Sequence, residues 1–422
     1  MTPIRGVWRD VPYPSAVPND ETPNHRLRRL VVAVLTAFIL VVVIGVPVAI
    51  LAPVPKAEAS VPAAAATTTP AAHPKFPSFG DGAIGAVGLP GVLATSGSQS
   101  PHSIASITKV VTMLVVLDKK PLTGAQEGPT ITFTQRDVQI YQDVVANNGS
   151  NAAVAAGWKL TERQAIETTM LPSANNYAES LALWAYGSVP KYLTAARAFL
   201  KANGLTHTTL VDTNGLDPGD KSTPADLVAL GKLAHADPVL AQIVSMKSAT
   251  EPQVGLVTNT NELLGQAGVD GMKTGTTDQA GACLLFSAKV MVDGKPVELI
   301  GVILGAASHP QLDATVPGLL KSVAAGLHAV RLSSKAESFA TYHTKWGGTA
   351  KAVAAADETV LVWGKQSVTR ATRVAEIRGG RKNERVGSVT FTVAGRTVRV
   401  PLLLDRNVLA APVWWRLTHP VR

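Results

Sequence analysis

The sequence predicts an α/β (α+β) sandwich in which an antiparallel sheet packs against a block of helices, with a small all-β domain after it and one membrane-spanning helix before it. Three observations lead to this fold class. Helical patterns fill the middle of the chain, strand-like patterns flank them on both sides, and a long uncharged run lies near the N-terminus. Strands from both ends of the main domain would therefore join one sheet.

Length and composition set the outer limits. The chain has 422 residues, enough for two folded units with accessory segments, and its 46% hydrophobic and 16% charged residues are typical of a globular protein. The net charge of +9 is scattered and no nucleic-acid-binding motif accompanies it, so we expect no nucleic-acid partner.

Cys283 is the only cysteine in the sequence, which excludes an intrachain disulfide and predicts a small core residue. The histidines show no HExxH spacing and there is no GxSxG, so neither a zinc hydrolase nor a Ser-His-Asp hydrolase is supported, and we expect no metal or cofactor.

A membrane helix is predicted over residues 30–52, which carry no charged side chain and are long enough to cross about 30 Å of hydrocarbon. Arg26, Arg28 and Arg29 stand immediately before it. The positive-inside bias therefore makes residues 1–29 a disordered cytoplasmic tail and places the remainder outside the cell membrane.

A linker is predicted over residues 53–78, because a composition rich in Pro, Ala and Thr stays extended. Within it, Ala57-Glu58-Ala59 has the small-x-small form of a signal-peptidase site. A cleaved and secreted form is thus the alternative to the anchored one. The length of the apolar run favours the anchor.

The elements of the main domain, residues 79–335, follow in chain order. They are a Gly-broken hairpin at 82–97, a helix at 104–117, helices at 160–171, 175–187 and 189–204, a hairpin at 282–306 and a helix near 319–330. Thr161 and Gln164 form a capping box, and Gly204 suits a helix end. Asp293-Gly294 is a strong signal for a two-residue hairpin turn.

A small all-β domain is predicted over residues 340–422. Residues 387–405 alternate apolar side chains with Thr and Arg around a turn at Ala394-Gly395. For Trp414-Trp415-Arg416 near its end, packing in the core and a place at a membrane interface are both considered, with packing favoured.

Chemistry is first suggested by Ser106 and Lys109, which are three apart on a predicted helix and therefore neighbours on its surface. A serine hydroxyl needs a base to become a nucleophile, and a lysine can be that base if burial and nearby positive charge lower its pKa. The helix N-terminus adds positive potential, which disfavours the ammonium and stabilises an oxyanion. The SxxK spacing alone is weak evidence, and Ser188–Lys191 repeats it by chance.

Two further motifs accompany the SxxK pair. Ser173-Ala174-Asn175 lies in a predicted loop between two helices, and Lys273-Thr274-Gly275 begins a predicted strand. In this order, the three motifs form the active-site set of penicillin-binding proteins and class A β-lactamases.

The chain resembles the low-molecular-mass D-alanyl-D-alanine carboxypeptidases, which are serine peptidases among the penicillin-binding proteins. The resemblance covers about residues 80–333 and is carried by ASITK, LPSANNYAESLA, TNGLDPGDKSTPADLVALGK and TNELL followed by GVDGMKTGTT. It implies the β-lactamase/penicillin-binding transpeptidase-like sandwich. It also implies Ser106 as the nucleophile, Lys109 as its base, Ser173 as a proton relay to the leaving amine and Asn175 as a holder of the substrate backbone.

The same resemblance assigns the opposite wall of the cleft to substrate binding. Lys273 would hold the free carboxylate of a terminal D-Ala, with the Thr274 hydroxyl beside it. Gly275 would leave room for the substrate, and the Thr276 backbone N–H would join that of Ser106 as the oxyanion hole.

The implied activity is removal of the terminal D-alanine from peptidoglycan stem peptides ending in D-Ala-D-Ala, through an acyl-enzyme that β-lactam antibiotics also form. A β-lactamase is one alternative, but residues 211–220 lack the deacylating glutamate that a class A enzyme uses. A D,D-endopeptidase or transpeptidase of the same fold is another, and a sensor that acylates without turnover is a third.

Overall fold

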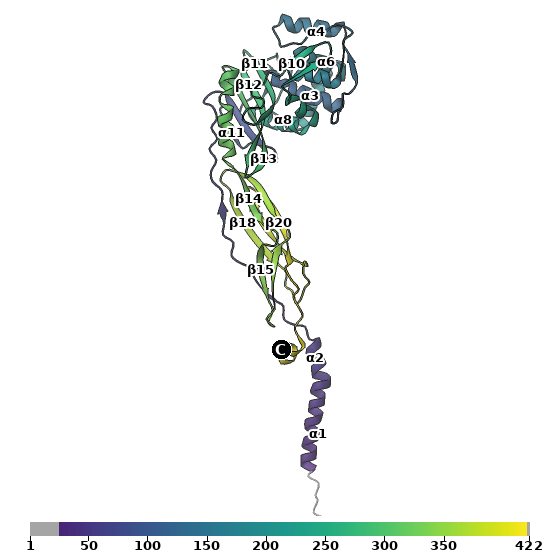
Figure 1. Cartoon of the computed structure of the whole chain (residues 1–422), viewed down its shortest axis with the longest axis vertical. Coiled ribbons are helices and arrows are strands. Elements are labelled where there is room, and N and C mark those ends of the chain that lie inside the picture. The colour runs from purple at the N-terminus through teal and green to yellow at the C-terminus, as the bar shows by residue number, and fades with distance from the viewer. Residues whose placement is uncertain (1–24, 420–422) are drawn as a thin grey trace, which may run out of the picture.

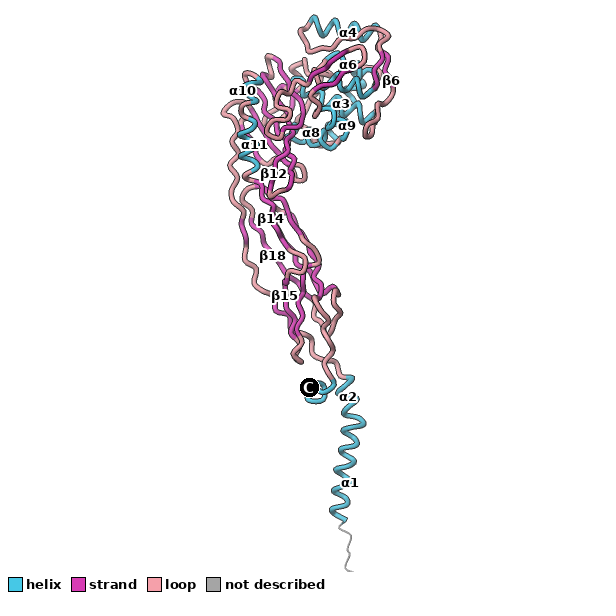
Figure 2. Tube along the Cα trace, in the orientation of Figure 1, coloured by secondary structure: helices cyan, strands magenta, loops and turns pink. Residues whose placement is uncertain are grey.

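The computed structural model describes residues 25–419, so most of the predicted tail lies outside the described residues. The molecule is elongated, with a domain of helices and strands at one end and the N-terminal helix at the other (Figure 1). A β-rich module lies between them (Figure 2). The C-terminal segment returns to the end of the N-terminal helix and contacts it.

The main domain is built around a five-stranded antiparallel sheet. Its strands are, in spatial order, β11 (Val269–Thr277), β12 (Gly281–Val292), β13 (Lys295–Ala306), β3 (Asp81–Ala86) and β4 (Ala94–Ser96). The first strand of the domain pairs with the last, which confirms the predicted sheet drawn from both ends. The predicted turn between β12 and β13 is also confirmed, because Asp293 and Gly294 both have positive φ, 48° and 76°.

A block of helices covers one face of this sheet, and two helices cover the other. The block consists of the 3₁₀ turn η2 (Ala105–Ile107), α3 (Thr108–Lys119), α4 (Gln135–Ala146), α5 (Glu162–Met170), α6 (Asn175–Tyr186), α7 (Val189–Ala202), α8 (Pro224–Ala236) and α9 (Pro238–Val244). The opposite face carries α10 (His309–Asp313) and α11 (Val316–Ala324). Alternate residues of β12 face the two cores: Cys283 and Leu285 lie under the block, whereas Leu284 and Phe286 lie under α11.

Three two-stranded ribbons complete the main domain. They pair β5 (His102–Ser103) with β8 (Lys221–Ser222), β6 (Thr130–Thr132) with β7 (Lys159–Thr161), and β9 (Ser248–Glu251) with β10 (Gly255–Thr258). The predicted capping box of α5 is present, since the Thr161 hydroxyl accepts from the Gln164 N–H and the Gln164 amide oxygen accepts from the Thr161 N–H.

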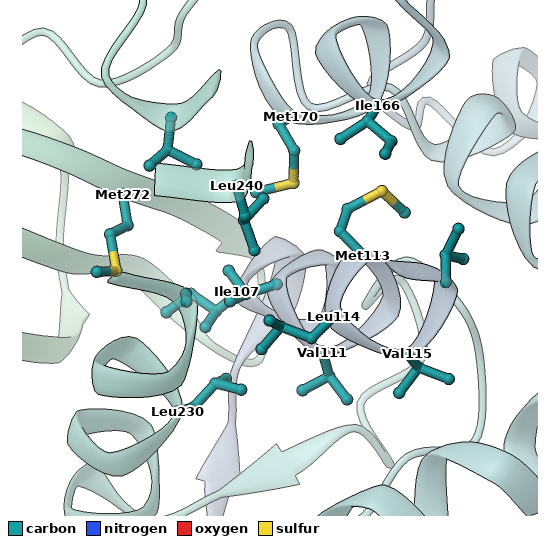
Figure 3. Close-up of a cluster of buried hydrophobic side chains, with 14 of the residues drawn as sticks. Ile107, Val111, Met113, Leu114, Val115, Ile166, Met170, Leu230, Leu240 and Met272 are labelled. Carbon is teal, nitrogen blue, oxygen red and sulfur yellow. The ribbon is translucent and has the colours of Figure 1, made fainter. Parts of the chain in front are cut away.

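Helix α3 lies at the centre of the block. Every residue from Thr108 to Leu117 is buried. Figure 3 shows Met113 of this helix directed toward Met170 and Ile166 of α5, within one continuous apolar core. Because each fully buried apolar side chain stabilises the fold by about 1.5–3 kcal/mol, α3 is a firmly held support for the residues at its N-terminus.

The β-rich module contains a ribbon and a seven-stranded sheet. The ribbon pairs β14 (Leu327–Ser333) with β17 (Glu358–Trp363). The sheet runs, in spatial order, β1 (Glu58–Ser60), β15 (Ser338–His343), β16 (Thr349–Ala354), β20 (Arg396–Leu404), β19 (Arg385–Val393), β18 (Ser367–Val374) and β2 (Thr67–Thr68). Phe339, Tyr342 and Phe391 form part of its core. The predicted turn at Ala394-Gly395 joins β19 to β20, with positive φ at both residues, 50° and 71°.

The segment predicted as a free linker is part of this module. Its residues form β1, which pairs with β15, and β2, which pairs with β18. The Thr69 hydroxyl donates to the Gly364 carbonyl at 2.5 Å and accepts from the Gln366 N–H at 2.8 Å. The composition correctly predicted an extended chain. It did not predict that this chain would pair with the open edges of two strands, β15 and β18.

Two other boundaries differ from the prediction. The helix expected near residues 319–330 ends at Ala324, because Leu327–Ser333 is drawn into β14 by pairing with β17. The module therefore begins before residue 340. The helix expected at 104–117 starts as the 3₁₀ turn η2 and becomes α-helical only at Thr108.

The N-terminal helix begins earlier than predicted. A continuous 27-residue helix is formed by α1 (His25–Leu40), the π-helical turn η1 (Val41–Gly45) and α2 (Val46–Leu51). The most apolar stretch of this helix is not buried against the rest of the protein.

The C-terminal segment ends in a short helix, α12 (Val413–Thr418), which the all-β prediction missed. Arg416 Nη1 donates to the carbonyls of Ile50 at 2.5 Å and Ala52 at 3.2 Å, at the end of α2. Trp415 is 6% exposed and packs edge-on against Trp346, whereas Trp414 is 63% exposed. The favoured packing role is thus confirmed for Trp415 alone.

Candidate active site

Ser106 lies in the 3₁₀ turn that connects the ribbon strand β5 to α3. Its neighbours Ala105 and Ile107 are wholly buried, while Ser106 itself is half-buried. Ala105 has a positive φ of 47°, a strained value for a residue with a side chain. The turn thus presents the Ser106 hydroxyl at the N-terminal end of a buried helix, where the helix dipole is positive.

Lys109 is 0% exposed, and its amine lies within hydrogen-bond distance of three oxygen atoms. Nζ lies 2.8 Å from Ser106 Oγ, 2.5 Å from Asn175 Oδ1 and 2.9 Å from the Asn214 carbonyl oxygen. Burial, and then the positive charge of Lys273, hold the pKa of Lys109 well below its usual value. A neutral amine has two N–H groups for Asn175 and Asn214, which leaves its lone pair for the proton of Ser106.

The second motif begins in the loop after α5, as predicted, and its last residue lies in α6. Ser173 has a positive φ of 63° and is 4% exposed, and its hydroxyl has no hydrogen-bond partner among residues 25–419. Asn175 is the first residue of α6, and its N–H donates to the Ser150 carbonyl at 2.8 Å. The Asn175 side chain was expected to hold substrate; in this structure its oxygen holds Lys109.

The third motif lies inside β11 rather than at its start. β11 is an edge strand of the five-stranded sheet and packs against η2. A Cβ at Gly275 would lie 3.1 Å from the Ser106 nitrogen, so the strand and the serine turn touch through their backbones.

Lys273 is 1% exposed, and its amine has no hydrogen-bond partner in the described part of the chain. Burial lowers the pKa of Lys273 to about 7. A buried amine without a partner is costly unless an anion arrives. The Thr274 hydroxyl lies 2.6 Å from that of Thr260, and the Thr276 hydroxyl lies 2.8 Å from His309 Nε2.

The loop at residues 211–220 packs against Lys109 and the serine turn. It supplies the Asn214 carbonyl to Lys109, and the Thr213 carbonyl accepts from Thr112 Oγ1 at 2.7 Å. Gly215 has a φ of 85°, and a Cβ there would come 1.9 Å from the Ala105 carbonyl oxygen. Only glycine fits at this contact between the loop and the serine turn.

The structure therefore brings Ser106, Lys109, Asn175 and Lys273 together, with Gly275 against the serine turn. Sequence reasoning did not find Asn214, Thr260 or His309. The TNGLDPGD segment contributes to the family resemblance, but Asn214 acts through its backbone carbonyl, and the type of residue gives no sign of this role. Within residues 25–419, no group of three or more His, Cys, Asp or Glu side chains is arranged to hold a metal ion.

Residues 90–308 match the protein family described as D-alanyl-D-alanine carboxypeptidase, peptidase S11. The D-alanyl-D-alanine carboxypeptidase of Streptomyces sp. strain K15 is 32% identical over 244 residues, which are 53% of this chain and 80% of that protein. DacC of Escherichia coli is also 32% identical, over 224 residues, but the chain spans only 53% of its length. The crystal structure of penicillin-binding protein 5 from Haemophilus influenzae is similar in fold, with a TM-score of 0.58 at 20% identity, covering 80% of this chain and 99% of that one.

Proposed function

Because this chain belongs to the D-alanyl-D-alanine carboxypeptidase family and is a serine-type peptidase, we propose that it removes the terminal D-alanine of peptidoglycan stem peptides through an ester on Ser106. One observation carries the assignment of residues. The buried Lys109 amine lies 2.8 Å from the Ser106 hydroxyl, and its pKa is lowered, so it can take the proton that the nucleophile must lose.

The acylation step follows from these positions. Neutral Lys109 accepts the Ser106 proton as Oγ attacks the carbonyl carbon of the penultimate D-Ala. The N–H groups of Ser106 and Thr276 stabilise the oxyanion. The carbon–nitrogen bond then breaks, and the amine of the last D-Ala leaves with a proton relayed through Ser173. Water hydrolyses the ester and restores the free serine.

The carboxylate of the leaving D-Ala gives Lys273 its role. A buried amine with a pKa of about 7 and no partner in the described residues is only partly charged near neutral pH. A substrate carboxylate beside it stabilises the ammonium, and the Thr274 hydroxyl adds a hydrogen bond. Substrates that end in a free carboxylate are therefore preferred.

The loop at 211–220 supports hydrolysis of peptides over that of β-lactams. Asp212, an acidic side chain of this loop, is occupied by backbone N–H groups of the loop itself. The loop also contains no glutamate of the kind that deacylates class A β-lactamases. We therefore expect β-lactams to acylate Ser106 and to be hydrolysed slowly.

The test is the release of free D-alanine from a muropeptide that ends in D-Ala-D-Ala, using the full chain in detergent micelles. Ser106→Ala and Lys109→Met are expected to abolish release. Lys191→Met, in the chance SxxK match, is the matched control and is expected to behave as the unmodified protein. Release that persists in Ser106→Ala would refute the nucleophile.

We also propose that the helix at residues 25–51 spans the cell membrane once and leaves the main domain outside. Its 27 residues are apolar and its most apolar window is unburied, and Arg26, Arg28 and Arg29 lie at its start. The alternative cleavage site is folded into the module, since Ala57 is buried and Glu58–Ser60 forms β1. Mass spectrometry of the membrane fraction tests this: peptides from residues 25–56 of the mature protein support the anchor, and their absence refutes it.

A further inference from the structure

Asp212 organises the loop behind the proposed base. Its Oδ1 accepts from the N–H groups of Asn214 at 2.8 Å and Gly215 at 2.6 Å, and its Oδ2 accepts from the Asp217 N–H at 2.8 Å. Three backbone donors on one carboxylate define a tight turn. Without a negative acceptor at its centre, these N–H groups would have to find other partners.

The turn fixes the position of one atom that Lys109 uses. The carbonyl of Asn214 belongs to the turn, and it accepts from Lys109 Nζ at 2.9 Å. Gly215 in the same turn lies against the Ala105 carbonyl, one residue before the nucleophile. The turn therefore contacts Lys109 directly and touches the residue that precedes Ser106.

Asp220 holds the other end of the loop. It is 0% exposed, and its Oδ1 accepts from the N–H groups of Val211 at 2.7 Å and Asp212 at 3.2 Å. Burial, and then the charge of Asp212, raise the pKa of Asp220 to about 8.

These charges also act on Lys109. Burial and Lys273 lower the pKa of Lys109, whereas Asp212 and Asp220 act in the opposite direction. Among the described residues these are the charged groups that shift it, since its remaining partners, Ser106, Asn175 and the Asn214 carbonyl, are neutral.

We propose that Asp212 is a positioning residue for the general base: it folds the turn at residues 212–217 that delivers the Asn214 carbonyl to the Lys109 amine. This inference rests on the proposed function, in which Lys109 takes the proton of Ser106. The side chain of Asp212 is bonded to backbone N–H groups of the loop. It acts on the reaction through the turn and through its charge.

Two replacements of Asp212 separate geometry from charge. In Asp212→Asn the amide nitrogen would face the Asp217 N–H, donor against donor, and the negative charge is lost. In Asp212→Glu the charge remains, but the longer side chain displaces the turn. Asp217→Asn is the matched control, because it removes a charge from the same loop while the amide oxygen of the new side chain can still accept from the Gly219 N–H, as Asp217 does at 2.7 Å.

The experiment measures the rate constant of Ser106 acylation by a fluorescent penicillin between pH 5 and pH 9, using the full chain in micelles. Asp212→Asn is expected to acylate about 10–100-fold more slowly, because a misplaced reacting group costs that much. The acidic limb of its profile should also move to lower pH, since a group that raises the pKa of Lys109 is gone. Asp212→Glu should be slow with the limb unmoved, and Asp217→Asn should match the unmodified protein.

A rate and profile unchanged in Asp212→Asn, with acylation abolished in Ser106→Ala, would overturn the inference while leaving the proposed function intact. If Asp212→Asn does not fold, as judged by circular dichroism, Asp212→Glu decides the matter, and an unchanged rate there overturns the inference. Acylation that survives in Ser106→Ala would instead refute the proposed function.

Discussion

Gly275 and Ser106 are in backbone contact across the site. A side chain at position 275 would place its first carbon 3.1 Å from the Ser106 nitrogen and 3.0 Å from the Ile104 carbonyl oxygen. The edge strand β11 and the serine turn are thus so closely spaced that an added methyl group would push the neighbouring backbone away by a few tenths of an ångström. The Ser106 N–H is one of the two proposed oxyanion donors, so this spacing sets its direction.

Gly275→Ala should therefore slow acylation at little cost in stability. The loss of one well-aimed oxyanion donor typically costs about 10²–10³-fold in rate, and we expect the lower end of that range because the strand can yield slightly. Stopped-flow acylation and a thermal melt measure the two effects. Gly318→Ala, where the added carbon would meet no atom within 4 Å, is the control. An acylation rate equal to that of the control would argue against the contact.

Lys273→Met should stabilise the fold and weaken substrate binding. The folded-state pKa of Lys273 is about 7 against an ordinary value of 10.5, so between these values the unfolded chain binds more protons. The stability of the unmodified protein therefore rises with pH over this window, and the advantage of the variant should shrink from pH 7 to pH 10. Melts across this range test it, with Lys295→Met at an exposed position as control. An advantage that is constant with pH would contradict the lowered pKa.

Glu251→Gln should stabilise the protein at pH 8 but not at pH 4. Burial, then hydrogen bonding to Glu167, raises the pKa of Glu251 to about 8 from 4.5. Between these values the folded state holds more protons than the unfolded state, so the unmodified protein loses stability as the pH rises. Thermal melts at several pH values should show the variant becoming more stable than the unmodified protein above about pH 5. Glu58→Gln, on an exposed strand, is the control. The same pH-dependent gain in stability in this variant would show that the effect is not specific to Glu251.

Arg416→Ala should loosen the C-terminal helix without changing D-alanine release from a soluble peptide. The guanidinium donates to two carbonyls at the end of α2, and hydrogen bonds from charged groups contribute about 1.5–3 kcal/mol. Hydrogen exchange of residues 411–419 should become faster. Arg406→Ala breaks only an exposed pair with Asp405 and should leave this exchange unchanged. Exchange that is equally slow in both variants would show that the hydrogen bonds from Arg416 to α2 do not hold the C-terminal helix in place.

The order of helical and strand-like patterns predicted that strands from both ends of the main domain share one sheet. The details that were predictable are those fixed by neighbours in the sequence. The capping box of Thr161 and Gln164 and the turn at Asp293-Gly294 need only residues that are close along the chain. β14 could not be found in this way, because its partner β17 begins 25 residues after β14 ends, and its apolar side chains fit a helix equally well when read alone. The strands β1 and β2 are too short to leave a periodic pattern, and their partners lie far along the chain.

The candidate site was predictable to the extent that side chains carry it. Ser106, Lys109, Asn175 and Lys273 stood out because their residue types occur in a known order. The contacts made through the Asn214 carbonyl and the left-handed turn at Gly215 depend on backbone geometry, which no single residue type specifies. Asn175 shows a different limit: its place at the site was expected, but the direction of its amide oxygen depends on where Lys109 lies.

In the proposed membrane topology, the pairing of β1 and β2 with the module also bears on how far Ser106 would lie from the lipid surface. Because residues 58–60 and 67–68 are paired with a folded module, this connection is less extensible than a free chain of the same length. Deleting residues between β1 and β2 would not lower the catalytic domain; it would strip the edge strands from β15 and β18. In that topology, insertion or removal of module strands would change the distance between the membrane and Ser106.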